Sequence, residues 1–151
     1  MDVWPQCLHY LTEMRAIRKP EGFRGQEVYY VPEALRQEAR QNPLGIGLHV
    51  LHIGWFPAAD GHFIQRESGL DEWLLMVCSA GSGWLRIGGP DKRIACGDVV
   101  VIPPGCPHAY GADREHPWSI HWAHFNGTAA AAYGALMDDF RTFVDDPALD
   151  E

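Results

Sequence analysis

Residues 97–110 constrain the fold of this chain more than any other segment. The four β-branched residues at 99–102 are typical of a strand that is buried on both faces. Two prolines follow directly, and because proline has no N–H to give to a neighbouring strand, the strand must end there. His108 and Tyr110 then lie two residues apart on an extended segment and face the same side. The pattern predicts a buried strand, a rigid corner and a strand that presents polar side chains at the mouth of a barrel.

Short apolar stretches separated by Gly, Pro, Asp and Ser turns begin at residue 45. Short strands at such intervals are typical of an antiparallel sandwich or barrel, whereas alternating strands and helices would need longer connections. The expected fold class is therefore mainly β. Strands are predicted at 47–56, 62–66, 72–79, 83–87, 92–95, 99–102, 109–110 and 118–125, with a hairpin-like turn at 88–91.

The two flanks of this β region have a different character. A short helix is predicted at 8–17, a strand at 26–31 and a second helix at 32–41, which begins with proline and ends before Asn42-Pro43. After residue 125, an alanine-rich run predicts a C-terminal helix at 129–140, followed by an extended piece at 141–144. The predicted organisation is an N-terminal arm and short helix (1–44), a β-barrel (45–126) and a C-terminal helix that starts a linker (127–151).

Composition excludes several functional classes. The 151 residues carry a formal net charge of −8 and no run of basic residues, so the chain alone is not expected to bind nucleic acid. The four cysteines are far apart in sequence and form no zinc-binding spacing, and Cys78, in an apolar stretch, is predicted to be a buried free thiol. No signal peptide or apolar segment of membrane-spanning length is present, which predicts a cytoplasmic protein.

The spacing of Gly97, Pro103, Gly105 and His108 matches the second signature of the cupin superfamily. Three further segments complete an ordered series, at 61–66, 81–89 and 117–125. With them, roughly residues 45–135 resemble the N-terminal effector-binding domain of AraC-type transcription regulators, in particular the sugar-responsive members. The resemblance implies a cupin-type double-stranded β-helix (a jelly-roll barrel), an N-terminal arm that closes over a pocket, and a sensor domain excised from a longer regulator; a naturally short chain is the alternative.

Eight histidines make a metal site the first alternative to test. The resemblance places His108 at the position of the last cupin histidine ligand, but residues 68–74, where other ligands should lie, contain no histidine. One histidine is too few, because a catalytic zinc or iron site takes at least three protein ligands. His62, His121 or His124 would have to join His108. The preferred interpretation is neutral, hydrogen-bonded histidines in a metal-free barrel, with no metal and no cofactor.

Arg66 is the leading candidate for a ligand contact. Strand alternation puts His62, Ile64 and Arg66 on one face. An arginine flanked by apolar strand residues needs a partner, and its five donors suit vicinal hydroxyls or a carboxylate. The alternative partner is a neighbouring acid, namely Glu67, Asp71 or Glu72. The family resemblance favours a ligand, because a ligand-binding arginine occupies the matching position in the arabinose-responsive member.

Residues 118–125 contribute a second face to the predicted pocket. Alternation places on it Trp118, Ile120, Trp122 and His124. A tryptophan offers a flat apolar surface and one N–H donor, which suits a sugar ring, although Trp122 could instead be a core residue. By resemblance, Trp122 matches a ligand-stacking tryptophan and Tyr110 a ligand-contacting tyrosine. Ile120 replaces the family's histidine in this strand, and His124 lies two residues further on the same face, so arabinose itself is not implied.

These observations together predict a sensor rather than an enzyme. The expected function is that of an AraC-family effector-binding domain, which binds a small polar molecule, expected to be a sugar, and so controls DNA binding by a helix-turn-helix domain that this chain lacks. A homodimer is expected for the full-length protein, and no membrane partner. The predicted ligand-binding residues are Arg66, Tyr110, Trp122, His108, His124 and His62.

Two alternatives remain at this stage. One is a metal-dependent cupin enzyme, such as an isomerase or a dioxygenase, which would need a metal held by His108 together with His62 or His124. The other is a dimerisation module with a vestigial pocket, in which Arg66, Tyr110 and Trp122 would be packing and salt-bridge residues. A pocket filled by the protein's own side chains would favour this second alternative.

Overall fold

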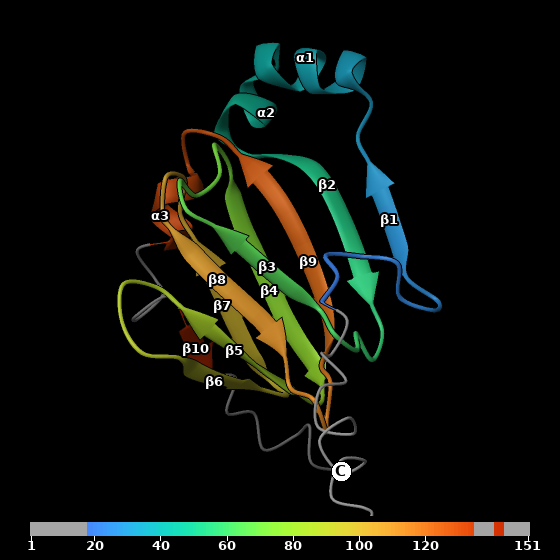
Figure 1. Ribbon diagram of the computed structural model, residues 1–151. Helices are drawn as coiled ribbons and strands as arrows, with labels where there is room; N and C mark the ends of the chain where they lie inside the picture. The colour runs from blue at the N-terminus through green and yellow to red at the C-terminus, as the bar shows by residue number, and fades with distance from the viewer. Residues whose placement is uncertain (1–17, 135–140, 144–151) are drawn as a thin grey trace, which may run out of the picture.

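The computed structural model describes residues 18–134 and 141–143, and its strands form two facing antiparallel sheets (Figure 1). The larger sheet has six strands, in the order β1 (Glu27–Tyr30), β2 (His49–Phe56), β9 (Ser119–Asn126), β4 (Trp73–Ala80), β7 (Asp98–Ile102) and β10 (Arg141–Phe143). The smaller sheet has four, in the order β3 (Phe63–Arg66), β8 (His108–Ala112), β5 (Ser82–Arg86) and β6 (Lys92–Ala95). The mainly β jelly-roll expected from the sequence is confirmed.

The hydrophobic core lies between the two sheets. Alternate residues of β4 point inward, so that Leu74, Met76 and Cys78 are buried while their neighbours in the strand are more exposed. β9 alternates in the same way and buries Ile120 and His124. From the smaller sheet, Leu85, Ile94 and Tyr110 complete the buried cluster. The pleat of each strand therefore decides which side chains face the space between the sheets.

The segment that most constrained the fold behaves as predicted. In β7, Val100, Val101 and Ile102 are all buried, in agreement with a strand covered on both faces. The chain turns after the two prolines and re-enters as β8, where His108 begins the strand. β8 is longer than the predicted 109–110 because Gly111 continues the pairing to β3 and β5.

The helices occupy the flanks. The predicted helix at 32–41 is α1 (Glu33–Gln41), and it lies with α2 (Pro43–Gly47) at one end of the sheets (Figure 1). α2 was not expected from the sequence. Asn42 ends α1, and its side chain also accepts a hydrogen bond from the N–H of Leu44 and so caps the start of α2. α3 spans Ala130–Gly134. The rest of the predicted C-terminal helix and the helix predicted at 8–17 lie outside the described residues.

Two predictions from composition can be compared with the structure. Cys78, Cys96 and Cys106 are all free thiols, and Cys78 is buried as expected, so that burial raises its pKa to about 11. Within residues 18–134 and 141–143, no helix is both long enough and apolar enough to cross a membrane.

Candidate functional site

A cavity of about 290 Å³ opens between the sheets. Five of the six side chains singled out from the sequence line it, namely His62, Arg66, Tyr110, Trp122 and His124. The sixth, His108, adjoins the cavity through its contact with Arg66. The pattern of alternation in three strands thus brings these residues together. Because the cavity is hollow, the structure gives no support to a vestigial pocket filled by its own side chains.

Arg66 forms the polar centre of one wall. Its Nη1 atom donates to Nε2 of His108 and to Oη of Tyr110, each over 3.2 Å. These partners are neutral, and Arg66 makes no ion pair with any carboxylate of the described residues. The salt bridge to a neighbouring acid that the sequence left open is therefore not seen in this part of the chain. A half-buried guanidinium with donors to spare faces the cavity.

His108 is held in a single hydrogen-bonding arrangement. Its Nδ1 lies 2.7 Å from the carbonyl oxygen of Cys106, which can only accept, so Nδ1 carries the proton. Nε2 is then free to accept from Arg66. Burial, together with the positive charge of Arg66, lowers the pKa of His108 and favours this neutral form. Both ring nitrogens are thus in use, and neither offers a free lone pair to a metal.

His62 lies where the cavity meets the core. Only 4% of the residue is exposed, and its Nδ1 accepts a hydrogen bond of 3.1 Å from the indole N–H of Trp118. The rings of Phe23 and Phe56 pack edge-on against it. Burial, and then the charge of Arg66, lower the pKa of His62 to about 4, so the imidazole is neutral near pH 7. Its main contacts are those of a core residue.

Trp122 forms the apolar side of the cavity. Its ring packs at a steep angle against Phe56 and His124. Gly54 of β2 lies directly beneath the ring, and a Cβ atom there would collide with it. The indole N–H is buried and finds no hydrogen-bond partner among the described residues. An unpaired buried donor is costly, which distinguishes Trp122 from an ordinary core tryptophan.

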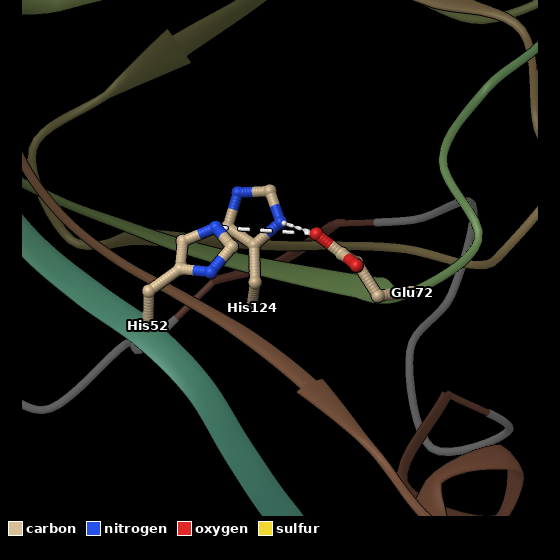
Figure 2. Close-up of side chains that lie close together, drawn as sticks. All are labelled: His52, Glu72 and His124. Atoms are coloured by element: carbon tan, nitrogen blue, oxygen red, sulfur yellow. Dashed lines mark hydrogen bonds and ion pairs between the residues drawn. The ribbon is translucent and has the colours of Figure 1, made fainter. Parts of the chain in front are cut away.

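A cluster of three side chains occupies the wall opposite β3. Figure 2 shows His52 of β2, His124 of β9 and Glu72, which directly precedes β4. Oε1 of Glu72 accepts from Nδ1 of His124 over 2.9 Å and lies 3.9 Å from Nε2 of His52. The two imidazoles stack with centroids 4.2 Å apart. Burial, followed by the charges of His52 and Arg66, lowers the pKa of His124 to about 3.

The histidines that the sequence offered as metal ligands do not converge. His121 points to the outer face of the larger sheet, where it stacks on Trp55, because it is one residue out of phase with Trp122. Within the described residues, the single cluster of three potential ligands consists of His52, Glu72 and His124. Of the predicted set, therefore, only His124 belongs to it.

Comparisons with known proteins bear directly on this arrangement. Residues 55–151 match the family model described as AraC-like ligand binding domain. The chain belongs to this family. The matching region contains Arg66, Tyr110, Trp122 and most of the barrel. The resemblance inferred from the four sequence segments is thereby confirmed at the level of the family.

Two curated relatives of this AraC-like domain are named as regulators. The MmsAB operon regulatory protein of Pseudomonas aeruginosa is 36% identical over 104 residues, which are 66% of this chain and 34% of the relative. The Msm operon regulatory protein of Streptococcus mutans is 32% identical over 60 residues, 40% of this chain and 22% of the relative. The matched part of the chain thus spans a third or less of the length of these proteins.

One solved structure of similar fold is the protein YhaK from Escherichia coli, with a TM-score of 0.52 and 8% sequence identity. The match covers 82% of this chain and 55% of that protein. At this level of identity the likeness concerns the fold alone.

Two residues that precede β1 also line the cavity. Pro20 and Glu21 line the cavity. Lys19 is tied to the barrel by two backbone hydrogen bonds, of its N–H to Gly61 and of its carbonyl to the N–H of Phe63. Phe23 then inserts against Phe56 and is 5% exposed. The segment is therefore anchored on both sides of the two residues that face the cavity.

Sequence reasoning missed His52 and Glu72. A bulge between Val50 and His52 interrupts the pairing of β2 with β9, so Leu51 and His52 are both shielded and simple alternation fails there. Glu72 lies in a turn rather than at the start of the strand predicted at 72–79, and the sequence offered it only as an alternative partner for Arg66. The one signal in the sequence was His124, a histidine on the inward face of a predicted strand.

Proposed function

We propose that this domain senses a small polar effector, which binds in the cavity between the two sheets and contacts Arg66. The observation that carries the proposal is the guanidinium of Arg66, which faces the cavity with only neutral partners among the described residues. A half-buried guanidinium has lost part of its hydration, and an effector that supplies oxygen acceptors would replace the lost hydrogen bonds. Family membership and the regulator names of the relatives support a regulatory role.

The effector we propose is a sugar or a closely related polyhydroxy compound. The ring of Trp122 supplies an apolar face for the C–H surface of a pyranose or furanose. Tyr110 and Arg66 supply polar contacts from the opposite sheet. In this proposal, the protein contacts the sugar directly through these side chains, with no metal between them, while His62 and His108 hold the pocket in shape.

We further propose that the domain is a non-enzymatic, cytoplasmic part of a larger AraC-type regulator. Residues 1–44 would act as the arm, 45–126 as the sensor barrel and 127–151 as the start of the link to a helix-turn-helix DNA-binding domain and to a homodimer partner. Effector binding would stabilise one position of the arm and thereby bias DNA binding. The size of this bias is limited by the difference between the affinities of the effector for the two arm positions. The contact of Pro20 and Glu21 with the cavity supports this coupling.

A thermal-shift screen of sugars and sugar acids tests the proposal, because a ligand that binds only the folded protein raises its melting temperature. We expect one class of sugar to raise the melting temperature, and Arg66→Ala to weaken its binding by about 1.5–3 kcal/mol, roughly 10- to 150-fold, as for a lost charge-assisted hydrogen bond.

The matched control is Arg86→Ala, which removes an exposed arginine paired with Asp91 on the β5–β6 hairpin. This variant should bind the sugar as the parent does. Equal loss in both variants, or undiminished binding by Arg66→Ala, would contradict the assignment of the cavity. If no sugar shifts the parent protein, the sugar class is wrong, and titration with small carboxylates then decides whether Arg66 binds an anion.

A further inference from the structure

The cluster of His52, Glu72 and His124 has the composition of a metal site. Each residue offers one ligand atom, and the three atoms lie within 4.8 Å of one another. Two imidazole nitrogens and one carboxylate oxygen form the donor set of many zinc sites and of the facial triad that binds iron(II). Figure 2 shows the three side chains converging from three different segments of the chain.

The distances are close to those that a metal ion requires. With bonds of about 2.0–2.1 Å, tetrahedral ligand atoms lie about 3.3 Å apart. The separation of 2.9 Å between Glu72 and His124 and that of 3.9 Å between Glu72 and His52 bracket this value. Glu72 is the side chain that would have to adjust to bring all three ligand atoms to this spacing, because it is more exposed than His124 and no ring packs against it.

The rest of the surroundings fit such a site. All three residues line the cavity, so three protein ligands leave at least one coordination position open toward the space that Arg66 faces. His52 also packs against Tyr30 and Trp122, which hold its ring in place. The positive charge of Arg66 acts on His52 and His124 and works against cation binding. An effector with negative or polar oxygens would offset that repulsion.

We propose that His52, Glu72 and His124 bind one divalent transition-metal ion of the zinc class on the cavity wall opposite Arg66. This site is distinct from the cupin pattern considered from the sequence, because His108 takes no part in it. The proposal replaces the metal-free barrel predicted from the sequence but leaves the effector contacts of Arg66 unchanged. The competing explanation is a hydrogen-bonded network in which His124 simply donates to Glu72.

The test is direct binding of Co²⁺ and Zn²⁺ to the full chain, prepared without a histidine tag and stripped with a chelator. We expect one equivalent of Co²⁺ with visible absorption bands of a four- or five-coordinate ion, displaced by Zn²⁺. His52→Gln and Glu72→Gln should each weaken binding more than about 100-fold, since loss of an outer partner alone costs 10- to 100-fold. His121→Gln, on the outer face of the same sheet, removes a histidine without touching the cluster and should bind Co²⁺ normally.

Several results would overturn the proposal. The first is the absence of stoichiometric Co²⁺ binding by the parent protein. The second is Co²⁺ binding by His52→Gln and Glu72→Gln that is as tight as binding by the parent. The third is a loss of binding in His121→Gln as large as in the cluster variants. Far-UV circular dichroism checks that each variant is folded, and the two substitutions at half-buried residues avoid disturbing buried His124. Arg66→Met should bind Co²⁺ at least as tightly as the parent while losing the sugar, so the metal site and the proposed function can fail independently.

Discussion

Trp118 and Trp122 lie four residues apart on the same inward face, yet their surroundings differ in every respect that matters for function. Trp118 is 1% exposed, and its N–H is bonded to His62. Trp122 is only partly buried, borders the cavity, and its N–H has no partner. Each ring rests on a glycine of a neighbouring strand, Gly83 beneath Trp118 and Gly54 beneath Trp122.

The difference separates a residue that holds the fold from one that is available to a ligand. A buried polar atom with its bond made contributes to stability, whereas one without a bond costs free energy that a binding partner can recover. The same residue type, at the same phase of one segment, therefore has two roles. Burial, hydrogen-bond satisfaction and the neighbouring space all distinguish them.

The largest expected effect comes from truncating the two rings. Trp118→Ala should lower the free energy of unfolding by about 3–5 kcal/mol, because it leaves a cavity in the core and an unpaired His62 nitrogen. Trp122→Ala should cost less than about 3 kcal/mol, since the ring already faces a cavity. Urea unfolding of both variants measures the two values. Equal losses would show that Trp122 is a core residue like Trp118.

The glycines beneath the rings offer a finer test. Gly83→Ala should destabilise the protein by up to about 3 kcal/mol, because the new methyl group meets Trp118 and the backbone of Gly111, neither of which can move. Gly54→Ala should cost less, about 2 kcal/mol, because Trp122 can shift into the cavity and only the carbonyl oxygen of Glu27, 2.8 Å from the new methyl group on edge strand β1, must also give way. Gly54→Ala should instead reduce effector binding. A lower melting temperature for Gly54→Ala than for Gly83→Ala would contradict the comparison of the two tryptophans.

The last test concerns pH and the partner of Trp118. His62 has a folded-state pKa of about 4 against 6.5 for a free histidine, so the unfolded chain binds more protons between these values and stability falls as the pH drops below 6.5. From pH 7 to pH 5 this residue should cost about 2 kcal/mol. His62→Gln, whose amide oxygen can still accept from Trp118, should remove that part of the pH dependence. Urea unfolding at both pH values gives the difference, and an unchanged slope would show that His62 is charged in the fold.

Much of the barrel could be predicted from the sequence. The β-branched run before the proline corner, the turns and the alternation of residues 118–125 fix strands and faces through local chemistry alone. Alternation assigned Arg66 and Trp122 to faces of their strands, the family resemblance assigned both of them and Tyr110 to one pocket, and all three line the cavity. The hydrogen bonds within the cavity, such as those from Arg66 to His108 and Tyr110, depend on the register in which β3 pairs with β8. The sequence did not predict this register.

The second wall could not be predicted in this way. His52 lies beside a bulge, where the two-residue period of the strand is lost, and Glu72 lies in a turn with no period at all. Both meet His124 only because β2, β9 and β4 are neighbours in the larger sheet. The order of strands in a sheet depends on pairing between segments that are distant in sequence, so no local sequence pattern predicts it.

The two facing walls have one further consequence, which concerns handedness. Arg66 presents donors from one sheet and Trp122 presents an apolar ring from the other, around one space of about 290 Å³. That space is itself chiral, so the two mirror images of a chiral molecule cannot make the same contacts with both walls. Under the proposed function, we therefore expect one enantiomer of the effector to bind more tightly than the other.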